Sequence, residues 1–300
     1  MKKVAIASGK GGTGKTTVCS SFFEFANKEF DPKKVIGVDC DVDAANMHIL
    51  FKHEVLSKKD FIGLGKAYLD DTKCIKCGKC VSACRFDAIT WDRDAQDTYP
   101  EFHHLSCEGC ATCFEICPSK AIEIVKEPAG RTISTLTYMN SPLIYGELKY
   151  GEEASGKLVS DVKMEATKLA KQNNAEILLI DCSPGVGCPV IASITGTDFV
   201  VIVTEPTVSG LHDLSRLYEL TKHFKLPVAV IVNKYDINKE VTDQIDNFCS
   251  DNNINFLGTI PYDDNFNEAM AQCIPIVKFS PNSVTSKSLS NIWTKLKKLI

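Results

Sequence analysis

The stretch that most restricts the fold is SGKGGTGKTT, residues 8–17, which follows the apolar run VAIA. Gly9 and Gly14 fit the pattern G-x-x-x-x-G-K-[ST], in which backbone N–H groups between a buried strand and a helix surround phosphates. The stretch also fits the shorter dinucleotide-binding pattern G-x-G-x-x-G through Gly9, Gly11 and Gly14. Because the longer pattern is much rarer by chance, we expect a strand, a phosphate-binding loop and a helix, in this order.

Further apolar runs repeat this arrangement of strand and helix. They are rich in β-branched residues and nearly continuous, which is typical of strands buried on both faces. These runs lie at residues 2–8, 33–41, 175–183, 197–206, 226–234 and 255–262. Segments of helical periodicity lie between them, at residues 14–30, 160–174, 209–224 and 238–253. The alternation predicts an α/β fold with a doubly wound, mostly parallel sheet.

Composition and charge exclude several classes of protein. The chain of 300 residues is 44% hydrophobic and carries a net charge of -4, which argues against a general nucleic-acid binder. The apolar stretch after MKK ends at Gly9-Lys10, too early for a signal peptide, and no long apolar run follows. We expect a cytoplasmic protein that binds no nucleic acid and is not attached to a membrane.

The glycine-rich loop predicts a site for a nucleotide and magnesium. Lys15 is placed to neutralise β- and γ-phosphate oxygens, and Thr16 supplies a hydroxyl for Mg²⁺. Asp181 ends the apolar run ILLID and is placed as the carboxylate that holds the metal, while Asp39 and Asp41 end another run. The dinucleotide interpretation leaves the lysine, the threonine and Asp181 unexplained. We expect ATP to contact Gly9, Gly11, Gly12, Thr13, Gly14, Lys15, Thr16 and Thr17.

A second lysine in the loop, Lys10, cannot easily reach the nucleotide that Lys15 binds. With this KGGTGKT loop, the chain apart from an insert resembles the deviant Walker A ATPases, the class of MinD, ParA, Mrp and the nitrogenase iron protein. The resemblance implies a homodimer through the ATP-binding face, in which Lys10 reaches the partner's ATP. A cation delivered only on dimerisation makes hydrolysis conditional on assembly.

The same resemblance implies roles for later motifs. DCDVDAAN becomes the first switch segment, with Asp41 as the residue that positions the attacking water. DCSPGVG, which starts at Asp181, becomes the second switch segment. Asn233 in VNKYD is implied to contact the adenine, with Pro261 of the loop IPYDD nearby.

The β and α alternation breaks after Leu50 and resumes near Ser160. We therefore expect the ATPase domain to comprise residues 1–60 and 128–300, and an inserted domain to comprise residues 61–127. Residues 127–158 read as a return segment with possible hairpin strands.

Fourteen cysteines point to metal binding, since disulfides are rare in the cytosol. CIKCGKCVSAC and CEGCATCFEIC are two copies of C-x₂-C-x₂-C-x₃-C and resemble a two-cluster bacterial ferredoxin, in which the last cysteine of each run ligates the other cluster. Structural zinc sites, the rival, pair CxxC elements at longer separations. The resemblance implies two [4Fe–4S] clusters, on Cys74, Cys77, Cys80 and Cys117 and on Cys107, Cys110, Cys113 and Cys84. The first run departs from the usual C-P ending, because Arg85 follows Cys84.

Cys182 and Cys188 flank the second switch segment. Cys188 lies seven residues after Asp181, as a cluster-binding cysteine does in the nitrogenase iron protein, so a third, bridging cluster is an open hypothesis. No CxxC follows Cys117, which disfavours a simple cluster carrier of the Mrp kind. The terminal SLSNIWTKLKKLI reads as a packing helix with Leu289, Ile292, Trp293, Leu296 and Leu299 on one face.

These patterns favour a Mg²⁺-dependent, homodimeric ATPase that couples its nucleotide cycle to the clusters and passes electrons to a redox or metallocofactor protein. Two alternatives remain open. One is an assembly factor that delivers iron–sulfur or other metal cofactors, and the other is a positioning protein of the ParA or MinD kind with structural or sensory clusters.

Overall fold

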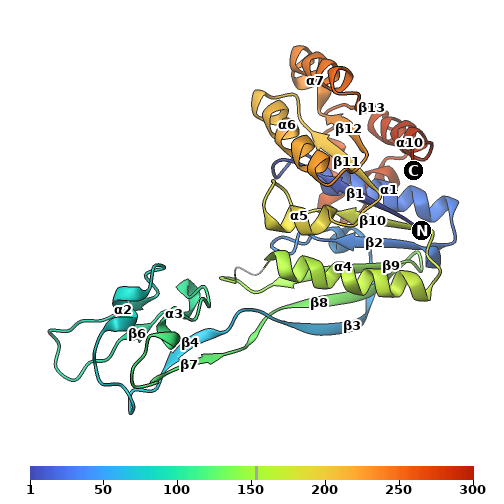
Figure 1. The fold of residues 1–300 in the computed structure, drawn as a ribbon. Helices are drawn as coiled ribbons and strands as arrows, with labels where there is room; N and C mark the ends of the chain where they lie inside the picture. Colours follow the sequence, from blue (N-terminus) through green and yellow to red (C-terminus); the bar gives the residue numbers. More distant parts are fainter. Residues whose placement is uncertain (153–154) are drawn as a thin grey trace. The chain divides into compact units, whose positions relative to one another are not determined.

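The computed structural model describes residues 1–152 and 155–300 of the chain. The chain divides into two compact units, coloured along the sequence in Figure 1. The first unit comprises Met1–Lys59, Thr132–Glu147 and Gly156–Ile300, and the second comprises Asp60–Arg131 and Leu148–Ser155.

A nine-stranded sheet forms the centre of the first unit, in the order β13-β12-β11-β1-β10-β2-β9-β8-β3. The strands from β13 to β9 in this order pair in parallel, which confirms the α/β, mostly parallel sheet. The strands are β1 (Lys2–Ala7), β2 (Val35–Asp39), β3 (His53–Ile62), β8 (Pro128–Thr137), β9 (Pro142–Leu148), β10 (Ile177–Asp181), β11 (Phe199–Thr204), β12 (Val228–Asn233) and β13 (Asn255–Ile260).

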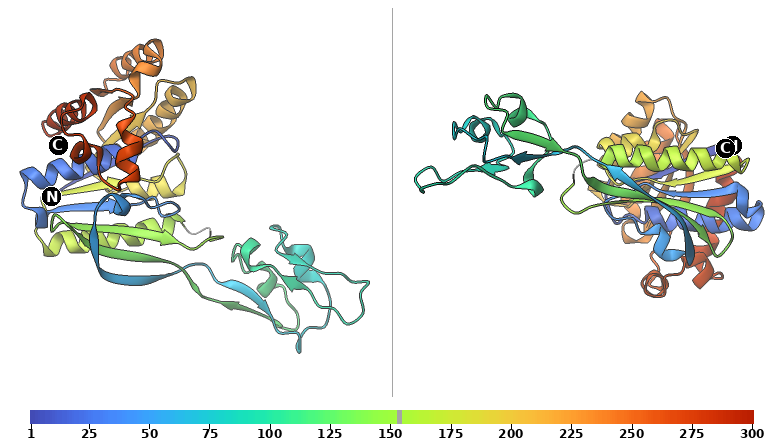
Figure 2. Two further views of the ribbon diagram at one scale, coloured as in Figure 1. Left: turned by 180° about the vertical axis from the view of Figure 1, so that it is seen from behind. Right: turned by 90° about the horizontal axis from the view of Figure 1, so that it is seen from below.

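Helices cover both faces of this sheet (Figure 2). On one face lie α4 (Ser155–Gln172), α5 (Cys188–Ile194) and α6 (Val208–His223), and on the other lie α1 (Lys15–Glu29) and α10 (Val284–Leu296). Because apolar helices pack on each face, every residue of β2, β11 and β12 is buried. The remaining helices of the unit are α7 (Lys239–Asp251), α8 (Asn265–Ala271) and α9 (Ile276–Phe279).

The terminal helix α10 packs onto α1 and completes the core. Trp293 is 1% exposed, and its ring centroid lies 5.3 Å from that of Phe22, with the two rings tilted by 41°. Its indole N–H donates a hydrogen bond to Oε1 of Glu29 at 3.2 Å. The predicted packing face is confirmed for Leu289, Ile292, Trp293 and Leu296 but wrong for Leu299, which is 41% exposed because it lies beyond the end of the helix. Within the described residues, no helix is both long and apolar enough to span a membrane.

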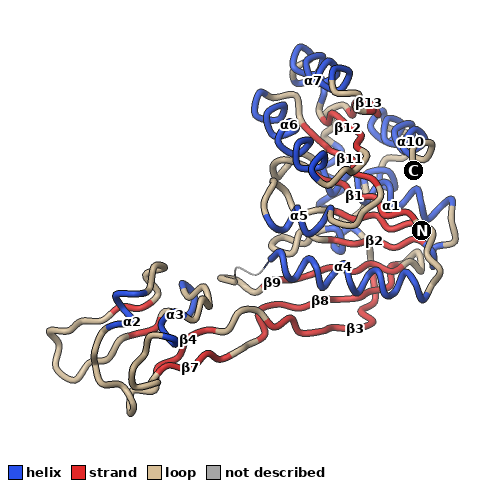
Figure 3. Tube along the Cα trace, viewed as in Figure 1, coloured by secondary structure: helices blue, strands red, loops and turns tan. Residues whose placement is uncertain are grey.

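The second unit has little regular structure (Figure 3). Its strands β4 (Lys66–Leu69) and β7 (Ile122–Val125) pair antiparallel, as do β5 (Ile89–Thr90) and β6 (Glu101–Phe102), and its helices are α2 (Lys79–Ala83) and α3 (Thr112–Glu115). Its core is a small cluster of Ala67, Ile89, Cys113 and Ile122. Units with so small a core usually need disulfides or metals for stability.

Candidate functional site

The loop between β1 and α1 adopts a backbone that favours glycine. Gly12 and Gly14 have φ angles of 79° and 88°, in the left-handed region. A Cβ atom on Gly14 would lie 2.3 Å from Nδ2 of Asn233, whereas one on Gly11 or Gly12 would meet no described atom within 4 Å. The loop therefore fits closely against β12 and presents bare backbone on its other side.

A cavity of about 450 Å³ lies at this loop. Two of the predicted contacts do not line it. Gly9 packs instead against α6, where an added Cβ would lie 2.4 Å from the Cβ of Asp213, and Pro261 is replaced in the lining by Tyr262 and Asp263. The other predicted loop residues all line the cavity: Gly11, Gly12, Thr13, Gly14, Lys15, Thr16 and Thr17.

The lining of the cavity combines two kinds of group. The loop and Asp41 are polar, and Leu50, Tyr262, Phe266 and Met270 contribute apolar side chains. Backbone N–H groups and a lysine suit phosphates, and apolar side chains suit a planar base.

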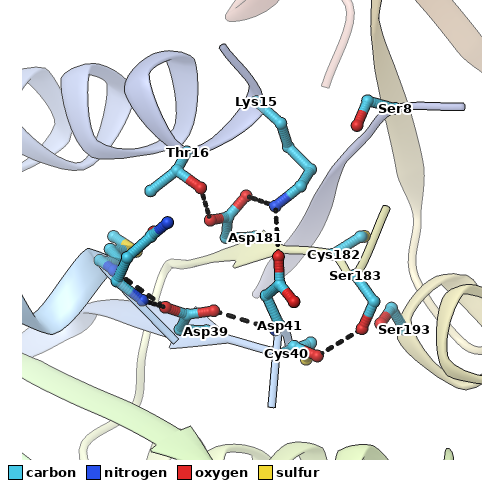
Figure 4. Close-up of polar contacts among 12 residues, drawn as sticks. Ser8, Lys15, Thr16, Asp39, Cys40, Asp41, Asp181, Cys182, Ser183 and Ser193 are labelled. Atoms are coloured by element: carbon cyan, nitrogen blue, oxygen red, sulfur yellow. Dashed lines mark hydrogen bonds and ion pairs between the residues drawn. The ribbon is translucent and has the colours of Figure 1, made fainter. Parts of the chain in front are cut away.

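Asp181 joins the loop lysine and threonine (Figure 4). Lys15 Nζ donates to Oδ1 of Asp181 at 2.7 Å, and the hydroxyl of Thr16 donates to Oδ2 at 2.6 Å. Burial alone lowers the pKa of Lys15, but the charge and hydrogen bond of Asp181 outweigh it, so the pKa lies above its ordinary value. Two adjacent residues of the loop thus meet at one carboxylate from a distant part of the sequence, as the sequence predicts.

Asp39 organises the segment that follows β2. Its carboxylate accepts hydrogen bonds from the N–H groups of Asp41, Asn46 and Met47, at 2.9 to 3.0 Å. Burial and the charge of Asp181 together raise the pKa of Asp39 to about 7, although the charge of Lys15 acts in the opposite direction. Asp39 therefore shapes the first switch segment and does not line the cavity.

Asp41 lies between Asp39 and the loop. Its Oδ2 is 3.9 Å from Nζ of Lys15, and its side chain lines the cavity. Burial raises its pKa to about 6, although the charge of Lys15 acts in the opposite direction. A partly buried carboxylate near Lys15 is suited to hold a water molecule, including one that is bound to a metal ion.

Lys10 contacts residues of its own chain. Its Nζ lies 3.3 Å from Oε2 of Glu205 and 3.5 Å from the hydroxyl of Ser209. Glu205 also accepts a hydrogen bond from Lys234, whose Nζ lies 3.4 Å from the carbonyl of Gly12. One carboxylate thus holds two lysines beside the loop.

Asn233 supports the loop directly. Its Nδ2 donates to the carbonyl of Thr13 at 2.8 Å, and its Oδ1 accepts from the N–H of Lys234 at 3.0 Å. The residue lines the cavity, and these two hydrogen bonds use about half of the capacity of its side-chain amide.

Two buried polar atoms at the cavity lack partners among the described residues. They are Oγ1 of Thr13 and Oδ1 of Asn46, and both residues line the cavity. Buried polar atoms are normally hydrogen-bonded, so these two are available to a ligand.

The cysteines of the second unit line two separate cavities. Cys84, Cys107, Cys110 and Cys113 line one, together with Phe86 and Phe102. Cys74, Cys77, Cys80 and Cys117 line the other, together with Ile75 and Pro100. These are the two crossed sets that the ferredoxin resemblance implies.

In the described part of the chain, no group of three or more His, Cys, Asp or Glu side chains converges on a point that could hold a single metal ion. In a [4Fe–4S] cluster each thiolate binds a different iron at a corner of a cube, so cluster ligands surround a volume and need not share a point.

The cysteines of the second switch segment lie in different environments. Cys182 is completely buried beside β2, where the hydroxyl of Ser183 donates to the carbonyl of Cys40 at 2.6 Å. Cys188 is exposed at the start of α5. The structure does not bring these two cysteines to a common surface.

Several site residues were not predicted from the sequence. Glu205 follows β11 in VTEPT, and Asn46 follows Asp39 in DCDVDAAN, so both lay in segments already singled out. The sequence does not indicate the apolar residues of the cavity, Tyr262, Phe266 and Met270. Apolar side chains in a loop and a short helix resemble ordinary core residues.

The fold and sequence match known proteins along most of the chain. Residues 4–276 match the family model of the CobQ/CobB/MinD/ParA nucleotide binding domain. An uncharacterized protein of Methanocaldococcus jannaschii is 34% identical over 303 residues, which cover 99% of this chain and 97% of that protein.

Two solved archaeal structures have a similar fold. The cell division ATPase MinD of Pyrococcus furiosus aligns over 100% of this chain and 99% of its own, with a TM-score of 0.59 and 19% identity. The septum site-determining protein MinD of Pyrococcus horikoshii, complexed with Mg-ADP, aligns over 99% of this chain and 96% of its own, with a TM-score of 0.54 and 19% identity. The family match includes the loop, the two switch segments and β12, and the chain belongs to the CobQ/CobB/MinD/ParA family of P-loop nucleotide-binding proteins.

Proposed function

We propose that this protein is a homodimeric, Mg²⁺-dependent ATPase that couples its nucleotide cycle to two [4Fe–4S] clusters and passes electrons to a low-potential acceptor or metallocofactor protein. One observation carries the proposal: two complete cysteine quartets line separate cavities in a chain that also has a formed P-loop pocket. The P. horikoshii MinD structure, which contains Mg-ADP, supports the choice of a magnesium nucleotide.

The residues around Asp181 suit hydrolysis. When phosphates enter, Lys15 turns from Asp181 to the β- and γ-phosphate oxygens, and the backbone of Gly11 and Gly12 faces the same anion. Thr16 and Asp181 would hold Mg²⁺, and Asp41 would orient the attacking water. Each group stabilises charge that increases in the transition state.

The dimer supplies the last cation. Lys10 is one-third exposed and held by Glu205, so a partner's phosphates can compete for it. Transfer of Lys10 to the partner's nucleotide makes hydrolysis depend on dimerisation, as an arginine finger does.

The second unit has ligands that fit two clusters. Cys74, Cys77, Cys80 and Cys117 would hold one, and Cys107, Cys110, Cys113 and Cys84 the other, with largely apolar neighbours and with one exposed cysteine in each set. When bound, such clusters supply one-electron transfer at low potential.

The test is an anaerobic redox titration followed by EPR, without nucleotide, with MgADP and with MgATP. We expect about eight iron atoms per chain and a midpoint potential lowered by tens of millivolts with MgATP, where about 60 mV is about 1.4 kcal/mol for one electron. Two clusters with unchanged potentials would contradict the coupling and favour an assembly factor. A chain reconstituted without oxygen that binds no iron would contradict the cluster assignment itself.

A further inference from the structure

The two cysteine runs of the second unit carry opposite charge. Residues 72–86 contain four basic residues and no acidic one, whereas residues 107–117 contain two acidic residues and no basic one. The basic residues are Lys73, Lys76, Lys79 and Arg85, and the acidic ones are Glu108 and Glu115. The runs and the quartets do not coincide, because Cys84 and the charge of Arg85 belong with Cys110. Lys73 and Lys76 are paired with Asp70 and Asp97, at 2.7 and 3.9 Å. Lys79 is therefore the basic residue that matters most beside the quartet that contains Cys77.

A surface groove reaches the quartet that contains Cys77. It is lined by Cys77, Lys79, Arg93 and Ile116, among others. Cys77 is exposed, and Ile116 directly precedes Cys117, a member of the same quartet. We call this groove, defined by these four residues, the cationic groove. At this point the quartet borders the outer surface of its unit.

Arg93 is brought to this groove from outside the cysteine run. A Cβ atom on Gly78 would lie 2.0 Å from Nη2 of Arg93, so the guanidinium lies against the backbone between Cys77 and Lys79. Neither Lys79 nor Arg93 has a carboxylate within 4 Å among the residues that the structure describes. Their charges therefore face solvent without an internal counter-charge.

We propose that the cationic groove is the docking surface for a small acidic one-electron carrier protein. The inference deepens the proposed function, because it assumes that the Cys77 quartet is a redox centre. Apolar side chains of Ile116 and Ile75, which are 37% and 63% exposed, lie beside the unpaired cations. A small apolar centre with charged surroundings is typical of transient redox complexes, whose association is steered by electrostatics.

Charge decides the kind of partner. The quartet that contains Cys110 has Glu108 in its lining and the charge of Arg85 near Cys110, so opposite charges offset each other there. At the cationic groove no carboxylate of the described residues lies within 4 Å of Lys79 or Arg93, so an acidic protein is attracted to this groove. The net charge of the whole chain, -4, gives no general attraction for acidic proteins, so binding depends on this local patch.

The test measures binding to the anaerobically reconstituted full chain by surface plasmon resonance. The probe is a purified two-cluster ferredoxin of strong net negative charge. The double variant Lys79→Glu/Arg93→Glu should weaken binding at least tenfold at low salt and flatten its salt dependence. The matched control is Lys168→Glu/Lys171→Glu, which makes the same charge change on exposed positions of α4 and should change binding less than twofold. Equal losses in both variants overturn the proposal.

Iron content and circular dichroism show whether each variant is intact. If the groove variant loses iron, the test uses the wild-type chain instead. Its affinity for the acidic ferredoxin is then compared with its affinity for a basic cytochrome c. Preference for the acidic carrier supports the proposal, and equal or reversed affinities overturn it. The proposed function fails in a different way, through absent clusters or through potentials that do not respond to nucleotide.

Discussion

The Nζ atom of Lys10 lies 3.3 Å from Oε2 of Glu205 in the same chain. The family resemblance assigns this lysine to the nucleotide of the partner subunit. Here it forms an ion pair within its own chain, with a carboxylate that follows β11. Because Glu205 also binds Lys234, which touches the carbonyl of Gly12, the resting position of Lys10 is connected to the loop itself.

Lys10→Ala should remove the part of the ATPase activity that rises with protein concentration and leave nucleotide affinity nearly unchanged. The physical reason is that Lys10 does not line its own cavity. Steady-state hydrolysis over a range of protein concentrations, with nucleotide affinity measured separately, checks this. Wild-type rates at every concentration would contradict a role in trans.

Glu205→Gln should tighten the ATP-dependent dimer, because Lys10 loses the carboxylate that holds it in its own chain and keeps the weaker contact with Ser209. A partly exposed ion pair is worth about 0.2–1 kcal/mol, which corresponds to about 1.4- to fivefold in affinity for each pair. Analytical ultracentrifugation with a non-hydrolysable ATP analogue measures the dimer affinity. Lys234→Met is the control, since it removes the other lysine on Glu205 and leaves the Lys10 contact in place; the same tightening there would assign the effect to the loop.

Asp181→Asn should lower the free energy of unfolding of the nucleotide-free protein by about 3 kcal/mol, because it leaves Lys15 buried beside a neutral group. Urea denaturation measures the loss. The double variant Lys15→Met/Asp181→Asn should recover most of it, since no unpaired charge remains. If the losses of the two single variants simply add, the pair is not coupled.

Asp41 predicts a pH dependence. An Asp ordinarily titrates near 3.8, and burial raises the pKa of Asp41 to about 6. The folded chain therefore binds more protons between these values, and its stability falls as the pH rises through this window. Asp41→Asn cannot titrate, so its unfolding free energy should fall less from pH 4 to pH 6. Asp243→Asn, at an exposed position on α7, should follow the wild-type curve. Parallel curves for all three proteins would contradict the shift.

The crossed cysteine sets predict which single variants resemble each other. Cys84→Ser should change the same EPR signal as Cys107→Ser, although Cys84 belongs to the other run, because the two residues line one cavity. Cys117→Ser should pair with Cys74→Ser in the same way. The exposed Cys273, changed to serine, is the control and should leave both signals intact. If Cys84→Ser instead matches Cys74→Ser, each run holds its own cluster.

Much of the first unit was predictable because its strands are buried on both faces. β2 and β11 are continuous apolar runs that end in functional residues, so their place and direction follow from composition alone. β3 was not predicted, because it lies at the edge of the sheet and most of its residues are exposed. An exposed strand lacks the apolar signal that shows which sheet it joins.

The residues of the site could be predicted only where a recognisable sequence motif contains them. Lys15 and Thr16 stand in the loop pattern, and Asp181 ends a strand, so their meeting followed from the parallel sheet. The contact of Lys10 with Glu205 joins loops nearly 200 residues apart and depends on side-chain reach, which local patterns do not contain.

The ion pair of Lys15 and Asp181 has a consequence for the order in which ligands bind. Phosphate that arrives alone takes Lys15 and leaves a buried carboxylate without its cation, and magnesium that arrives alone leaves a buried ammonium. Each partial state has an uncompensated charge, while the state with both ligands has none. Magnesium and nucleotide should therefore enhance each other's affinity by the same factor, as thermodynamic reciprocity requires, and the half-filled site should be scarce.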